Sequence, residues 1–307
     1  NRERFKTLDE MSLPNFLCIG APKSGTTSLF EILKQHPEIG LSSFKEPHFF
    51  DNDVNWEKGL DWYKKNYFSG IESCKSIGEF TPSYLGYSVC VSRINETLGQ
   101  NVKFIVLLRN PIDRAYSHYL HTKRDEYENL SFLDSLEKEE DRLKDYKINK
   151  DDVSFSRFSY KYSSMYSLHL KNYLNEFKKE QFCIVLFDDF VNHREQVIKR
   201  ILNFLDVNEN IDLNIDIRTN TASKARSVHL KKFMAKKSIF RTLLKFMIPS
   251  LEFRQRIRNK IHERNNKAAN KASLTKEEKS LCYNNYFEND IKELEKMLDI
   301  NLNIWKP

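Results

Sequence analysis

The sequence predicts an α/β protein with a P-loop-like parallel sheet that is flanked by helices on both faces. Three short apolar runs predict buried strands at residues 16–20, 103–108 and 182–187. Each run is followed by a turn and then by a stretch with the apolar spacing of a helix. Strands that alternate with helices form parallel sheets, and ligands bind such sheets beyond the carboxyl ends of the strands.

The first strand-turn-helix unit begins at the apolar run 16–20. A turn over residues 21–25 follows it, and then a helix through about residue 35, which is expected to stop near His36 and Pro37. The apolar stripe of this helix consists of Leu29, Phe30, Ile32 and Leu33. This unit places the turn at one end of a buried strand.

The later units follow the same plan. The strand 103–108 runs into Arg109 and Asn110, and Pro111 suits the first turn of the next helix. The strand 182–187 precedes a helix around 195–205. A shorter fourth strand is expected at 77–79, and the tail 274–305 has the pattern of one or two amphipathic helices.

The 307 residues suit one domain, 1–307, with ordinary proportions of hydrophobic residues (40%) and charged residues (30%). No run of eighteen apolar residues is present, so no membrane span is expected. The net charge of +7 is unevenly placed, because the segment 224–271 holds fifteen Lys or Arg and two acids. The chain is therefore a mildly acidic body with one basic segment, of which 228–271 is predicted to be a helical insertion or subdomain.

Cysteine usage favours a reducing compartment. The five cysteines are odd in number and widely spaced, and no CxxC occurs, which argues against zinc and against a disulfide framework. A cytoplasmic location follows. Two glycosylation sequons, at Asn95 and Asn129, and a start at Asn1 without Met or an apolar leader keep a Golgi-type lumen open, with an anchor removed upstream.

The turn after the first strand has the composition of a phosphate site. In Gly20-Ala-Pro-Lys-Ser-Gly-Thr-Thr27, Gly25 allows the backbone to approach an anion, and the start of the following helix attracts it. Lys23 adds a positive charge, and Thr26 and Thr27 add hydroxyl donors. The alternative is a tight strand-helix turn with a surface lysine.

The position of the lysine separates two chemistries. Thr26 stands where a P-loop has its lysine, and the strand 103–108 ends in Arg109 instead of a metal-binding Asp. A guanidinium at this place suits a second phosphate, so the sequence predicts a site that binds two anionic groups without a metal.

Four motifs in order resemble those of sulfotransferases that use 3'-phosphoadenosine 5'-phosphosulfate (PAPS). They are Pro22-Lys23-Ser24-Gly25-Thr26-Thr27, Lys45-Glu46-Pro47-His48-Phe49-Phe50, Leu108-Arg109-Asn110-Pro111 with Arg114-Ala115-Tyr116-Ser117, and Asn220-Thr221-Ala222-Ser223-Lys224-Ala225-Arg226. The resemblance covers roughly residues 14–226 and 274–305. It is weak over the basic segment.

The resemblance implies a role for each motif. The donor nucleotide would be bound by Lys23, Ser24, Gly25, Thr26, Thr27, Arg109, Ser117, Ser223, Lys224 and Arg226. Glu46 would be the catalytic base, as in the heparan sulfate branch, and Lys23 the cation at the leaving group. His48, two residues on, would share a face with Glu46 in an extended segment and assist it, with Asp51 in support. The alternatives are a salt-bridged surface acid and a half-buried histidine.

The acceptor is less defined. Heparan sulfate 3-O-sulfotransferases carry a Lys at the position of Phe80, so the chain looks more like the broad bacterial-type branch that acts on carbohydrates or small molecules. The expected partner is a glycan or small metabolite, acidic if the basic segment is its platform, and no nucleic acid. That segment also suits a solvated helical face or a peripheral membrane contact.

Three rival functions remain at this point. A P-loop nucleotide kinase would need the lysine and the metal-binding Asp that are missing here. A nucleic-acid binder would use the basic segment 224–271 and show a steep salt dependence. A donor-binding protein without catalysis would bind the nucleotide normally and be indifferent to Glu46→Gln.

Overall fold

The central sheet has five parallel strands in the order β2-β3-β1-β4-β5. The computed structural model describes residues 13–149, 152–217, 223–225, 266–268 and 273–307. The strands are β1 (Phe16–Gly20), β2 (Ile39–Leu41), β3 (Ser76–Phe80), β4 (Lys103–Leu108) and β5 (Phe182–Leu186). Because β1 lies between β3 and β4, the loops after these three strands meet at one edge of the sheet.

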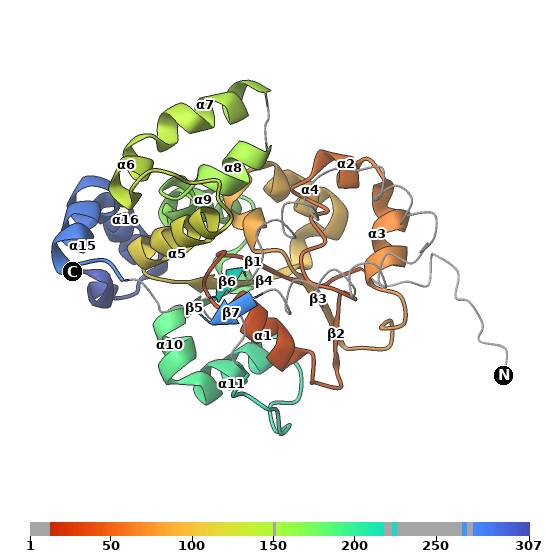
Figure 1. The fold of residues 1–307 in the computed structure, drawn as a ribbon. Coiled ribbons are helices and arrows are strands. Elements are labelled where there is room, and N and C mark those ends of the chain that lie inside the picture. Colours follow the sequence, from red (N-terminus) through yellow and green to blue (C-terminus); the bar gives the residue numbers. More distant parts are fainter. Residues whose placement is uncertain (1–12, 150–151, 218–222, 226–265, 269–272) are drawn as a thin grey trace.

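Helices cover both faces of the sheet (Figure 1). One face packs against α1 (Thr26–Leu33), α10 (Phe187–Asn192) and α11 (Arg194–Phe204). The other packs against α4 (Val89–Leu98), α5 (Pro111–Arg124), α9 (Tyr166–Leu174) and α16 (Glu288–Leu298). Alternate residues of β1 serve the two cores: Phe16 and Cys18 belong to the first, and Leu17 and Ile19 to the second.

Shorter elements complete the described chain. The remaining α-helices are α2 (Asp53–Trp56), α3 (Gly59–Tyr67), α6 (Phe132–Glu137), α7 (Glu139–Asn149), α8 (Asp152–Phe158) and α15 (Lys276–Cys282). Single turns of other helix types are Pro82–Gly86, Gly99–Asn101, Tyr162–Ser164, Lys179–Gln181, Tyr283–Phe287 and Asn303–Trp305. Trp305 is buried against Tyr166, which fixes the tail on the second core.

The predicted fold class is confirmed, with small corrections to its elements. The expected third strand ends one residue early, because Phe187 begins α10. The short fourth strand is the five-residue β3, which lies inside the sheet between β2 and β1. Gly78 permits this packing, since a Cβ there would come within 2.3 Å of the Phe16 ring.

Within the segment 228–271 only residues 266–268 belong to the described chain, so the helical insertion or subdomain expected there stays a prediction. Asn266–Ala268 form the strand β7, which pairs antiparallel with β6 (Ser223–Ala225).

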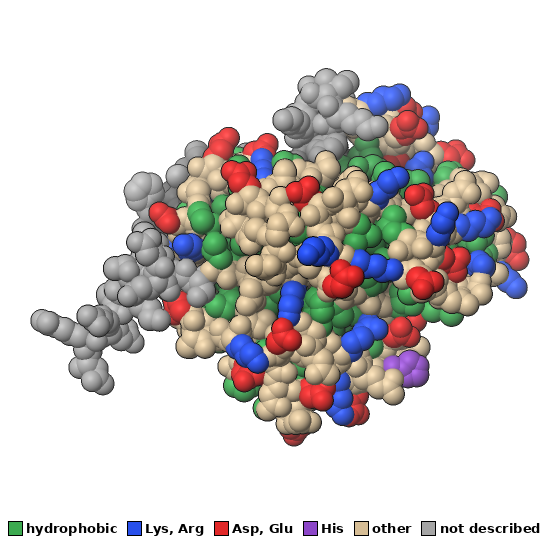
Figure 2. All heavy atoms as spheres, turned by 180° about the vertical axis from the view of Figure 1, so that it is seen from behind, with side chains coloured by type: hydrophobic (Ala, Val, Ile, Leu, Met, Phe, Trp, Pro, Cys, Tyr) green, Lys and Arg blue, Asp and Glu red, His purple; other side chains and the backbone are tan. Residues whose placement is uncertain are grey.

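The surface and the cysteines add two facts. Figure 2 shows Lys or Arg and Asp or Glu side chains interspersed over one face of the described chain, without a broad patch of one sign. All five cysteines are unpaired, and only Cys74 is partly exposed. None of the helices in the described ranges has the length and apolar character needed to cross a membrane.

Candidate active site

The predicted phosphate turn joins β1 to α1, and its backbone shape depends on Gly25. This glycine precedes the first residue of α1 with φ 88°, a left-handed conformation that favours glycine. A Cβ at this position would also come within 3.2 Å of the Phe187 ring. No side chain of the described residues caps the helix start, so Gly25 leaves this end of α1 open to a ligand.

The hydroxyl groups of the turn lie at different depths. Ser24 and Thr26 are buried, whereas Thr27 is partly exposed. Within the described chain the buried Ser24 Oγ has no hydrogen-bond partner. A buried hydroxyl without a partner is costly, so a ligand oxygen at the turn would satisfy it.

Lys23 lies in the same turn with φ 71°. Burial, and to a lesser degree the positive charge of Arg124, lower the pKa of its ammonium group to about 8, against the opposing effect of the Glu46 carboxylate. The lysine therefore lies within electrostatic reach of the predicted base, although the two residues come from different loops.

Arg109 follows β4 and contacts the phosphate turn. Its Nη1 donates a hydrogen bond of 3.1 Å to the Lys23 carbonyl, and its guanidinium lies 5.0 Å from the centre of the Phe187 ring. Ser117 is partly exposed on α5 and, in the part of the chain described, does not hydrogen-bond to Arg109. The structure thus joins Arg109 to the turn, and the expected binding of one phosphate by Arg109 and Ser117 stays a prediction.

The third donor motif is only partly described. Ser223 and Lys224 belong to the short strand β6 and pair with Ala268 and Lys267. Arg226 lies outside the described residues, so its predicted contact with the donor stays a prediction.

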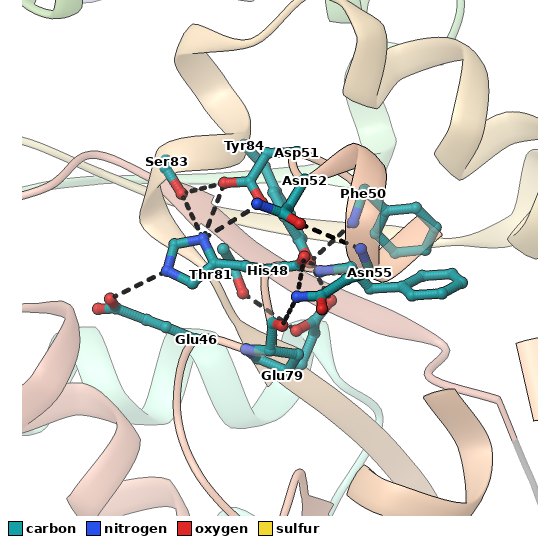
Figure 3. A network of polar contacts seen from close by, with 12 residues as sticks. Glu46, His48, Phe50, Asp51, Asn52, Asn55, Glu79, Thr81, Ser83 and Tyr84 are labelled. Carbon is teal, nitrogen blue, oxygen red and sulfur yellow. Dashed lines mark hydrogen bonds and ion pairs between the residues drawn. The ribbon is translucent and has the colours of Figure 1, made fainter. Parts of the chain in front are cut away.

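The predicted base stands in a loop between β2 and α2 (Figure 3). The Glu46 amide donates a hydrogen bond of 2.9 Å to the carbonyl of Phe80, which anchors the loop to the end of β3. Its carboxylate forms an ion pair with Lys45 and lies 3.7 Å from His48 Nε2. On the other side of the ring, His48 Nδ1 is 2.9 Å from Asp51 Oδ2. Ser83 donates a hydrogen bond of 2.6 Å to the same oxygen.

This arrangement fixes the charges of the pair. Burial lowers the pKa of His48, but hydrogen bonds and charges from Asp51 and Glu46 outweigh it and raise that pKa to about 10. Partial burial raises the pKa of Glu46, but Lys45 and His48 hold it well below its usual range. At neutral pH an imidazolium therefore lies between two carboxyl groups, one of them 44% exposed and the other, Asp51, nearly buried.

The expected proximity of Glu46 and His48 is confirmed, but the reason given for it is wrong. The segment is not extended, because Glu46 and His48 have φ values of 64° and 51°. Two left-handed residues flanking Pro47 turn both side chains to the same side. Such backbone is sparsely populated by residues other than glycine, so the surrounding contacts must hold it.

Sequence reasoning missed a second carboxylate behind this loop. Glu79, at the end of β3, is completely buried and accepts hydrogen bonds from Tyr63, Thr81 and Tyr84. Burial raises its pKa to about 7. Its only sequence signal was an acid in an otherwise apolar strand. The neighbouring Phe80 points into the other core and packs against Phe30, 5.4 Å between ring centres.

Comparisons with known proteins concern the family and the fold of this chain. The family model of the sulfotransferase domain matches residues 13–247. Heparan sulfate glucosamine 3-O-sulfotransferase 5 of Mus musculus is 32% identical over 201 residues, which are 62% of this chain and 54% of that protein. The membrane-associated sulfotransferase kil1 of Dictyostelium discoideum is 40% identical over 111 residues, 36% of this chain and 23% of that protein. The chain thus spans about half, or less, of these curated relatives.

Among solved structures, a sulfotransferase from Alicyclobacillus acidocaldarius superposes with a TM-score of 0.67. The alignment covers 96% of this chain and 99% of that one, at 24% sequence identity. The likeness extends over nearly the whole chain and concerns the fold.

Proposed function

The chain belongs to the sulfotransferase domain family, and on that premise we propose that it transfers a sulfuryl group from PAPS to a hydroxyl or amine of an acceptor. The observation that carries the proposal is the meeting of two loops. The loop that holds Glu46 is anchored to the end of β3, which pairs with β1, and the turn that holds Lys23 follows β1. The Glu46 carboxylate also acts on the pKa of Lys23. Both observations support a leaving-group cation and a base at one site.

The donor side is proposed to bind both anionic ends of PAPS. The turn 23–27 would take the phosphosulfate, with the orphaned Ser24 hydroxyl as one donor. Arg109 would take the 3'-phosphate together with Ser117, and residues 223–226 would close over the nucleotide. The proposal includes no metal ion, because a guanidinium stands where phosphate-transferring enzymes have a metal-binding Asp.

The reaction would be an in-line displacement at sulfur. The acceptor oxygen or nitrogen forms a bond to sulfur while the bond from sulfur to the bridging oxygen of the donor breaks. The acceptor proton passes to the Glu46 carboxylate, which the charges of Lys45 and His48 keep ionised. Lys23 stabilises the negative charge that develops on the leaving phosphate. Adenosine 3',5'-bisphosphate and the sulfated acceptor are the products.

The proposed acceptor is a carbohydrate or a small metabolite. Relatives named for heparan sulfate glucosamine support a glycan. Phe80, which fills the core instead of presenting a cation, separates this chain from their pattern. The cytoplasm is the proposed compartment, supported by five unpaired cysteines.

The first test is calorimetric titration of adenosine 3',5'-bisphosphate, without metal, into the wild-type protein and Arg109→Ala. Loss of a charge-assisted phosphate contact should weaken binding about ten- to a hundredfold. Arg200→Ala is the matched control, because Arg200 donates to the carbonyl of Ile184 in the middle of β5, away from the strand ends. Its affinity should equal that of the wild type.

The opposite outcomes point elsewhere. A wild-type protein that does not bind the bisphosphate would overturn the proposal. Titration of ATP with Mg²⁺ in the same instrument tests the kinase alternative. Titration of a nucleic acid at two salt concentrations tests the binder alternative.

A further inference from the structure

The loop around the proposed base has a backbone that must be held from outside. Glu46 and His48 are left-handed residues, and no regular helix or strand surrounds them. Its carbonyl groups are bound by polar side chains: Asn55 donates to the carbonyls of Pro47 and His48, and Arg93 donates to that of Phe50. The two amides between His48 and Asp51 are bound differently.

One phenol holds both of these amides. The hydroxyl oxygen of Tyr84 accepts a hydrogen bond of 3.0 Å from the Phe49 amide and one of 3.3 Å from the Phe50 amide. A hydroxyl has two acceptor lone pairs and a single proton. With two amide donors on the oxygen, that proton must point at another acceptor.

Glu79 provides the acceptor. The Tyr84 hydroxyl donates to Glu79 Oε1 over 2.9 Å. When Glu79 is ionised, its carboxylate only accepts hydrogen bonds, so it directs the phenol proton away from the amides. Figure 3 shows Tyr84 between the buried carboxylate and the loop. Without an acceptor at Glu79, the Tyr84 hydroxyl proton could turn toward the loop and displace one of the two amide hydrogen bonds.

The position of Glu79 is costly and is otherwise unused. Its carboxyl group is completely buried, and hydroxyl groups are its hydrogen-bond partners within the described chain. Burying a carboxylate without a cation is unfavourable, and the nearby charge of Asp51 adds to the cost. The proposed reaction gives Glu79 no contact with either substrate. Its contribution would therefore be to orient a neighbouring group, the Tyr84 phenol.

We propose that Glu79 and Tyr84 are positioning residues that act in series: the carboxylate orients the phenol, and the phenol fixes the Phe49 and Phe50 amides so that Asp51 and Glu46 bracket His48. The description of Glu46 as the base rests on the proposed function. The position of His48 between the carboxyl groups of Glu46 and Asp51 is independent of that function, because it is given by distances.

Tyr63 supplies a matched control. Its hydroxyl also donates to Glu79 Oε1, over 2.7 Å, but within the described chain it makes no hydrogen bond to the loop amides. The Tyr63 ring stacks on that of Phe49, 4.2 Å between centres, and Tyr63→Phe keeps this ring contact. Tyr63→Phe and Tyr84→Phe each remove one buried phenol hydroxyl from the same carboxylate. A purely structural role of the network predicts similar effects for both, whereas a positioning role predicts a difference at His48.

The experiment follows the His48 imidazole by NMR titration in the full chain and measures kcat for transfer from PAPS to heparan sulfate. Tyr84→Phe should lower the midpoint of His48 by about one unit and lower kcat about tenfold. The affinity for adenosine 3',5'-bisphosphate should stay unchanged. Tyr63→Phe should leave the His48 midpoint and kcat near their wild-type values. Equal effects of the two variants would overturn the proposal.

A second pair of variants tests the carboxylate. Glu79→Leu removes the acceptor and should reproduce Tyr84→Phe. Glu79→Gln keeps an oxygen toward Tyr84, and its amide nitrogen can donate to Thr81, so it should restore the His48 midpoint and most of kcat. If Glu79→Leu and Glu79→Gln gave the same His48 midpoint and the same kcat, the proposal that Glu79 acts through Tyr84 would be refuted. If the wild type neither binds adenosine 3',5'-bisphosphate nor transfers a sulfuryl group, the proposed function fails, and the His48 midpoints still decide the positioning. Nucleotide binding without transfer to heparan sulfate would exclude this acceptor only.

Discussion

The two halves of the candidate site are held by different means. The donor turn is shaped largely by its own sequence, a strand, a glycine with φ 88° and a helix start within eleven residues, and Arg109 binds one of its carbonyls. The base loop is shaped by residues far along the chain, because its amides and carbonyls bind Tyr84, Arg93 and the end of β3. Among the residues that the structure describes, the buried Ser24 hydroxyl of the donor turn has no hydrogen-bond partner.

The difference separates binding from chemistry. A turn with an open helix end and an orphaned hydroxyl is completed by its ligand. A loop whose backbone groups are already bound holds its side chains before any acceptor arrives, which suits a base that must be in place at the transition state. Changes in the two halves should therefore be separable in binding and turnover.

The largest expected effect is a loss of turnover on changing the base half of the site, without a change in nucleotide binding. Glu46→Gln removes the proton acceptor and should lower kcat about a hundred- to ten-thousandfold. The affinity for adenosine 3',5'-bisphosphate should not change, since the product carries no acceptor. Calorimetry and a transfer assay on one preparation measure both quantities. Weakened nucleotide binding would show that the halves are not separable.

A second prediction concerns stability in the base half. The pKa of Glu79 is raised from 4.5 to about 7 in the folded protein. Between these values the folded state holds a proton that the unfolded state has lost, so stability falls as pH rises. Relative to Glu79→Gln, the wild type should lose up to about 3 kcal/mol of unfolding free energy between pH 5 and pH 8. Urea titrations of both proteins at each pH measure this, and a constant difference would contradict a strained carboxylate.

The smallest expected effect belongs to the donor half. The pKa of Lys23 is lowered to about 8, so its ammonium group is lost above that pH. Nucleotide binding should weaken about tenfold per pH unit once most of the lysine is neutral. Lys23→Arg, which stays charged, should show a flatter profile in calorimetry from pH 7 to 9.5. Identical profiles would place the titrating group elsewhere.

The sequence was informative wherever structure is local. Continuous apolar runs predicted β1, β4 and β5, and the glycine and lysine of the first turn predicted an anion site next to Arg109. The three-residue β2 carries too short a pattern to be seen. It gains its place from pairing with β3, a contact that no window of sequence contains.

The base half was harder for the same reason. The motif around Glu46 was found by resemblance, but its backbone was expected to be extended. Glu79 belonged to a predicted strand and Tyr84 to the turn after it, and neither was recognised as part of the site. Their importance depends on Phe49 and Phe50, which are about thirty-five residues from Tyr84 along the chain and meet it only in the folded protein.

The strand order also has a consequence for biosynthesis. β1 is made first, yet it belongs at the middle of the sheet, and its partners β3 and β4 begin only at residues 76 and 103. A wholly apolar strand thus leaves the ribosome well before either neighbour exists to cover its edges. Until then it is open to unwanted association between nascent chains. Slow translation before residue 103 should prolong that vulnerable interval and increase the demand for chaperones.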